Sequence, residues 1–91
     1  MNVELEYSSP RGRDVHLTRK LKKPPPMLPN IGDAWLQAGW VCVVEGRMWT
    51  EAMDKVTIVL GPANQSLQDL RQIASDLVDA GWTDELHPLA D

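Results

Sequence analysis

The chain of 91 residues has no phenylalanine, one cysteine and two histidines, and these shortages exclude several classes of protein. The single cysteine, Cys42, cannot form an intramolecular disulfide, and no cysteine or histidine pair has zinc-ligand spacing. No apolar run approaches the roughly eighteen residues of a membrane span. The sequence also has no phosphate-binding loop and no dinucleotide fingerprint. We therefore predict no metal, no cofactor, no small-molecule ligand and no membrane contact.

The remaining composition is that of a small globular domain. The apolar fraction is 43% and the charged fraction 24%, both ordinary for a folded chain. We expect one domain over residues 1–82 and a loose acidic tail over residues 83–91. The charged N-terminal region predicts no signal peptide, and the single cysteine favours a reducing, cytoplasmic location.

Two stretches near the N-terminus alternate apolar and polar residues with the period of a β-strand. They cover residues 2–8 and 14–21, and a turn rich in proline and glycine separates them. Pairing Ser8 with Asp14 would place the apolar residues of both strands on one face. His16 would then lie on the polar face beside the glutamates of the first strand.

A second strand pair is predicted over residues 40–49 and 55–60. The first of these strands is rich in β-branched and aromatic residues and is apolar on both faces, so we expect it to be central and covered on both sides. Gly46 predicts a bulge or a bend within it. Residues 33–38 form either a short strand or a single helical turn. The residues expected on the core face of the first strand are Trp40, Cys42, Val44 and Met48.

A proline-rich segment and a helix complete the pattern. Residues 24–29 predict a stiff, extended connector, since proline fixes φ and has no N–H to donate. Apolar residues at three- and four-residue spacing predict a helix over residues 66–80. Ser66 is its expected N-cap and Gly81 its left-handed C-cap residue, with Trp82 folding back onto the helix.

These elements predict an α+β fold in which a small antiparallel sheet, made of two hairpins, packs against one C-terminal helix. We expect the helix to lie on the strands of residues 40–60. A small SH3-like barrel, with the helix as an appendage, is the alternative.

One part of the sequence resembles a known group of proteins. It comprises the turn Pro29-Asn30-Ile31-Gly32-Asp33 and the two strands that follow, Trp40–Glu45 and Val56–Leu60. This pattern is similar to small uncharacterised β-rich proteins of bacteriophages and other mobile elements, over residues 2–60. The resemblance implies a β-rich fold and a phage or bacterial origin, and it implies no activity.

The sequence offers no convincing catalytic residue. His16 lies on a polar strand face among acidic residues, and His87 precedes a proline in the tail. Cys42 lies on the core face of a strand, where a thiol behaves as a small hydrophobic group and not as a nucleophile. We therefore predict that the protein is not an enzyme.

The tryptophans carry the most information about function. We assign Trp40 and Trp82 to the core and the helix cap, whereas Trp35 and Trp49 flank turns, where burial is difficult. Exposed aromatic residues at such positions are favoured anchors of protein interfaces. The leading hypothesis is therefore a protein–protein interaction module that uses Trp35 and Trp49, with another protein or a second copy as its partner.

The alternative is a weak nucleic-acid-binding protein. Six basic residues lie between positions 11 and 23 and would neutralise phosphates. The net charge of −4 argues against this, because nucleic-acid-binding domains tend to be basic. The six residues are Arg11, Arg13, Arg19, Lys20, Lys22 and Lys23.

Overall fold

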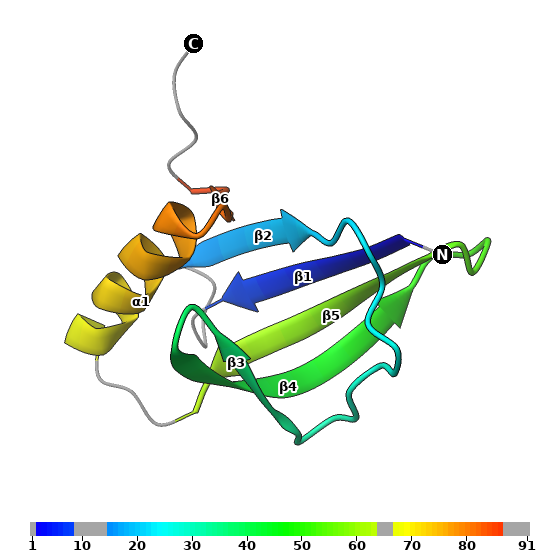
Figure 1. Ribbon diagram of the computed structural model, residues 1–91, viewed down its shortest axis with the longest axis horizontal. Helices are drawn as coiled ribbons and strands as arrows, with labels where there is room; N and C mark the ends of the chain where they lie inside the picture. The colour runs from blue at the N-terminus through cyan, green and yellow to red at the C-terminus, as the bar shows by residue number, and fades with distance from the viewer. Residues whose placement is uncertain (1, 9–14, 64–66, 87–91) are drawn as a thin grey trace, which may run out of the picture.

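A computed structural model describes residues 2–8, 15–63 and 67–86 (Figure 1). Within these residues the chain forms six strands and one helix, which confirms the α+β class. The elements are β1 (Asn2–Ser8), β2 (His16–Lys20), β3 (Ala34–Gln37), β4 (Trp40–Trp49), β5 (Lys55–Pro62), α1 (Leu67–Asp79) and β6 (Thr83–Asp84).

The strands form one open sheet in the order β3-β4-β5-β1-β2-β6. The predicted all-antiparallel arrangement is wrong, because β1 pairs in parallel with β5 at the centre of the sheet. The other pairings are antiparallel. The sheet does not close, so the SH3-like barrel is not formed. The short strand predicted within residues 33–38 is present as β3, and the helical turn is not.

The pairing of β1 with β2 differs from the predicted register by two residues. Ser8 lies opposite His16 and not opposite Asp14. A shift of two residues keeps each side chain on its original face, because side chains alternate with a period of two. The apolar side chains of both strands therefore still share the core, and His16 lies on the polar face as predicted.

A β-bulge in β4 changes which residues face the core. The pairing with β5 shifts between Val44 and Gly46, so Glu45 has no partner in the register. The extra residue reverses the alternation beyond it. Met48 consequently lies opposite Thr57 and is 55% exposed, so its assignment to the core face is wrong. The bulge itself agrees with the expectation at Gly46.

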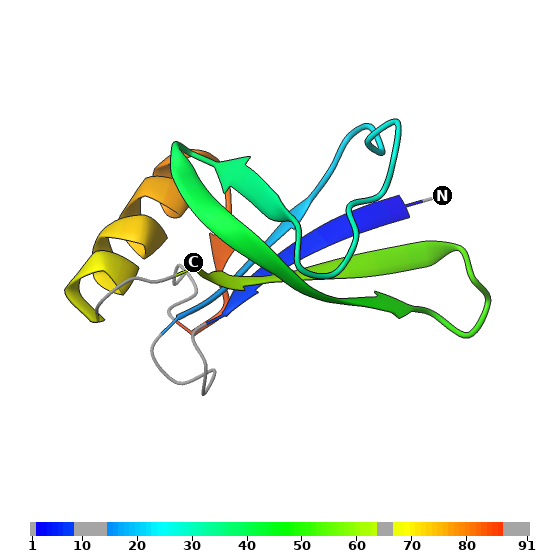
Figure 2. The same cartoon turned by 90° about the horizontal axis from the view of Figure 1, so that it is seen from below.

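No helix or strand of the described residues covers the second face of β4. Val41 alternates with the buried Cys42 and is exposed, contrary to the prediction that β4 is covered on both sides. Helix α1 and the connector between β2 and β3 lie on the opposite side of the sheet (Figure 2). One face of the sheet therefore holds the core, and no described element covers the other.

The turn between β3 and β4 is strained at Ala38. Ala38 and Gly39 have φ values of 50° and 84°, the left-handed pair typical of a two-residue type I′ hairpin turn. Asparagine tolerates this conformation better than alanine does. We expect Ala38→Asn to raise the free energy of unfolding by about 0.5–1 kcal/mol in urea titrations. Leu36→Asn, in the adjoining strand, should bring no such gain, and equal gains would contradict the explanation.

Helix α1 closes the core at one end of the sheet. Its residues Leu70, Ile73 and Leu77 are buried together with the apolar residues of β1, β2, β4 and β5. The helix backbone comes closest to β2 and β6. The apolar stripe of the helix shares its core with the strands of residues 40–60, on which it was predicted to pack, but also with β1 and β2. Its direct polar link to β4 is a hydrogen bond of 2.8 Å from Trp40 Nε1 to Asp76 Oδ2. Trp40 is consequently half-buried and not part of the innermost core.

The C-terminal end of α1 confirms the predicted cap. Gly81 adopts a φ of 105°, and its N–H donates to the carbonyl of Val78 at 3.0 Å. The N–H of Trp82 donates to the carbonyl of Leu77, also at 3.0 Å, which completes a Schellman motif. Trp82 is buried beside the helix as expected. The predicted N-cap, Ser66, lies outside the described residues.

The chain beyond the helix is more ordered than the predicted loose tail. Thr83 and Asp84 form β6 against β2, and the N–H of Glu85 donates to the carbonyl of His16 at 2.8 Å. β6 thus becomes one edge of the sheet. Residues 87–91 lie outside the described part of the chain.

Candidate protein interface

Trp49 ends β4 and is substantially exposed, as the sequence predicts for at least one of the two anchor tryptophans. Its side chain is 41% accessible. It lies opposite Val56, on the core side of the sheet. The end of β4 and helix α1 lie at opposite ends of the sheet (Figure 1). The side chain is therefore partly covered by the protein and partly open to solvent.

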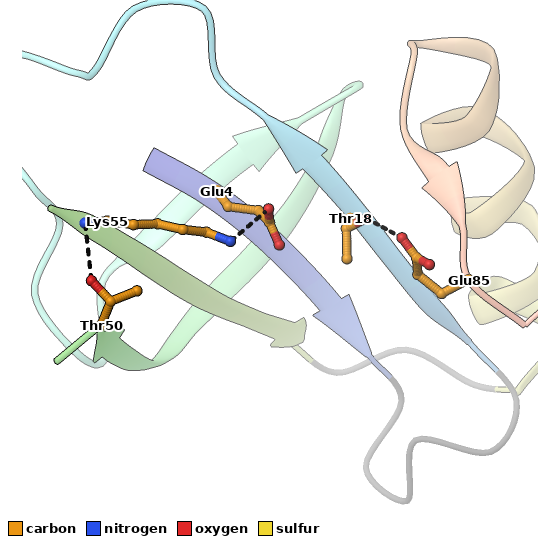
Figure 3. Close-up of polar contacts among 5 residues, drawn as sticks. All are labelled: Glu4, Thr18, Thr50, Lys55 and Glu85. Atoms are coloured by element: carbon orange, nitrogen blue, oxygen red, sulfur yellow. Dashed lines mark hydrogen bonds and ion pairs between the residues drawn. The ribbon is translucent and has the colours of Figure 1, made fainter. Parts of the chain in front are cut away.

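The hairpin tip beside Trp49 is held by hydrogen bonds. Thr50 Oγ1 donates to Asp54 Oδ1 at 2.6 Å. It also accepts the N–H of Lys55 at 3.3 Å (Figure 3). The bond from Thr50 lowers the pKa of Asp54. Lys55 Nζ lies 3.1 Å from Glu4 Oε2 on the neighbouring strand. These contacts hold the hairpin tip that follows Trp49.

Trp35 occupies a different place. It lies opposite Cys42 in β3 and is half-buried against the core. It also lines a surface cavity of about 320 Å³ with the proline-rich connector. Trp49 lies at the other end of β4, roughly 20 Å away at the rise of a β-strand. The structure therefore does not bring the two predicted anchors together.

The open side of the sheet carries a group of apolar side chains. Leu36 and Val41 lie directly opposite each other on β3 and β4, and both are exposed, at 64% and 44%. Met48 follows on the same side of β4, beyond the bulge. We call this surface the open apolar face, and its members are Leu36, Val41, Val43, Met48 and Val59.

Sequence reasoning missed the open apolar face. The alternation of β4 indicated apolar residues on both sides, but it could not say that one side lacks a cover. The unusually apolar edge strand was a usable signal, because exposed edges normally carry charge or proline. β3 has neither, since its sequence is Ala-Trp-Leu-Gln.

The basic residues that the structure describes are not gathered on one face of the sheet. Arg11 and Arg13 lie outside the described residues. Arg19 and Lys20 are neighbours on β2, so their side chains leave the sheet on opposite sides. The two exposed basic residues that follow β2 are Lys22 and Lys23.

The candidate catalytic residues lie in ordinary structural environments. His16 Nε2 lies 3.4 Å from Glu6 Oε1 on the open side of the sheet. Cys42 is fully buried, and burial raises its pKa to about 11, which keeps the thiol protonated at neutral pH. Within the described ranges, no three acidic, histidine or cysteine side chains are grouped as metal ligands would be.

Comparison with known proteins adds no family to these observations. Among the described residues, no helix has the length and apolar character needed to cross a membrane. The resemblance to small phage proteins stays a prediction. No family model, no curated protein and no solved structure matches the chain.

Proposed function

We propose that the protein is a non-enzymatic protein-binding module with two contact elements: the open apolar face, and Trp49, which ends β4 on the other, core side of the sheet. The observation that carries this proposal is the exposure of Leu36, Val41 and Met48 on the one side of the sheet that nothing covers in the described structure. Contiguous apolar surface is uncommon on a protein that works as a monomer.

The geometry around Trp49 supports its role as the anchor. A partly exposed aromatic side chain has few rotatable bonds to immobilise on binding, and a partner that covers it removes a large apolar area from water. Aromatic residues of this kind dominate the energy of interfaces. The neighbouring Met48 supplies an adaptable apolar surface.

A serine at position 49 tests the proposal. Because Trp49 is 41% exposed, Trp49→Ser should change the free energy of unfolding by no more than about 1 kcal/mol. The same change should weaken association by about 2 kcal/mol or more, as truncation of an interface anchor does. Sedimentation velocity over a concentration series measures self-association, and added bacterial extract measures association with another protein.

A matched control separates the anchor from general apolar exposure. Met27 is 83% exposed but lies in the connector, away from the open apolar face. Met27→Ser should leave association unchanged. The proposal fails if the wild-type chain stays monomeric in every arm, or if Met27→Ser weakens association as much as Trp49→Ser does.

A further inference from the structure

A cavity of about 690 Å³ lies beside the edge of β2, on the opposite side of β2 from β1. β6 pairs with this edge only at Leu17 and Thr18. The residues that precede β6 belong to the end of α1, so β6 does not extend along the edge beyond Thr18. Residues whose side chains leave β2 on opposite sides therefore both line the cavity at this edge. The polar residues that line it are Thr18, Arg19, Lys20, Lys22, Thr83 and Glu85.

The backbone of Lys20 also faces this cavity. The N–H of Leu21 donates to the carbonyl of Val3 on β1, whereas the carbonyl of His16 accepts a bond from the β6 side. Residues of an antiparallel strand alternate between its two neighbours. Lys20 and His16 are separated by an even number of residues, so their backbone groups point in the same direction. The N–H and C=O of Lys20 therefore point away from β1, at a position beyond the end of β6.

Three cations line this cavity without an ion-pair partner among the described residues. Among the described residues, the ion pairs involve Lys55 and His16, and none involves Arg19, Lys20 or Lys22. This is unusual in a chain of net charge −4. The one carboxylate among the cavity-lining residues is that of Glu85, which accepts a hydrogen bond from the hydroxyl of Thr18 (Figure 3).

We propose that this cavity is a binding site for a compact anion that carries phosphate groups. An arginine fork binds phosphate oxygens in pairs, lysines add point charges, and the Lys20 N–H and the Thr83 hydroxyl supply neutral donors. A long polyanion fits less well, because Glu4 and Glu6 on the adjacent β1 would repel it. The site is separate from the open apolar face.

Titration with inorganic pyrophosphate at fixed ionic strength, followed by amide NMR shifts, tests the site. We expect one-to-one binding, with shifts concentrated at residues 18–22 and 81–85. Lys22→Ala should weaken binding about three- to fivefold, as expected for loss of one exposed charge contact. Lys23→Ala is the matched control, because Lys23 is exposed and adjacent but does not line the cavity. Glu85→Gln should strengthen binding, because it removes the opposing charge and keeps an acceptor for Thr18.

Three results would overturn the proposal. The first is the absence of localised shifts at millimolar pyrophosphate. The second is equal weakening by Lys22→Ala and Lys23→Ala, which would indicate diffuse attraction. The third is tighter binding of a single-stranded oligonucleotide than of pyrophosphate, falling steeply with salt, which would indicate a nucleic-acid surface. We expect no measurable oligonucleotide binding at physiological salt.

Discussion

Leu77→Ala should lower the free energy of unfolding by about 2–5 kcal/mol, the usual cost of truncating a buried leucine. Leu77 is fully buried, and its carbonyl also accepts the bond from Trp82 that closes the helix cap. The loss combines the removed apolar contacts with the cavity left behind. For a domain of this size it is a large part of the total stability, which is about 5–10 kcal/mol.

The adjacent Val78 provides the control. It lies on the same turn of α1 but is 43% exposed. Val78→Ala should change stability by no more than about 0.5 kcal/mol, since alanine also favours the helix. Urea unfolding followed by tryptophan fluorescence measures both variants. A loss below about 0.5 kcal/mol for Leu77→Ala would mean that α1 is not docked on the sheet.

The elements of this fold were predictable because each has a strong local period. The helical stripe that contains Leu77 predicted α1 to within one residue at each end. Strict alternation around Leu5 predicted β1 in the same way. These patterns arise from the side chains of consecutive residues, so they need no knowledge of the rest of the fold.

The arrangement of the elements was harder to predict from the sequence than the elements themselves. The parallel pairing of Leu5 with Ile58 joins strands that are far apart in the sequence, and no local pattern encodes it. The bulge had a signal in Gly46, but its effect on alternation depends on where the extra residue lies. Because Glu45 is the extra residue, Met48 lies on the open side of the sheet and Trp49 on the core side, the reverse of what simple alternation predicts.

The candidate surfaces show the same limit. The exposure of Trp49 followed from its place at the end of a strand, which the sequence shows directly. The open apolar face depends on which side of the sheet α1 covers. The basic cavity depends on where β6 ends, because only an open edge allows Arg19 and Lys20 to line one cavity from opposite sides of β2.

Alkaline solution should destabilise the protein in two steps. Burial raises the pKa of Cys42 from 9.0 to about 11, and burial, together with Cys42 and Glu45, raises the pKa of Tyr7 above its ordinary 10.0. In both cases the unfolded chain loses the proton first. Stability is therefore fully present below pH 9, falls between pH 9 and 11 as the unfolded thiol ionises, and falls further above pH 10 through the tyrosine. The thiol alone accounts for about 3 kcal/mol, since each pKa unit corresponds to about 1.4 kcal/mol.

Two substitutions assign the steps. Cys42→Ala should remove the loss between pH 9 and 11, and Tyr7→Phe should reduce the loss above pH 10, with urea unfolding measured at each pH. The Tyr7 hydroxyl is buried and has no hydrogen-bond partner among the described residues, so Tyr7→Phe should leave stability at pH 7 unchanged or slightly higher. Lysine deprotonation acts on all variants alike and cancels in the comparison. If the wild type and Cys42→Ala lose stability in parallel up to pH 11, the thiol is not buried as the structure places it. A loss of more than about 2 kcal/mol at pH 7 in Tyr7→Phe would show instead that the hydroxyl has a partner.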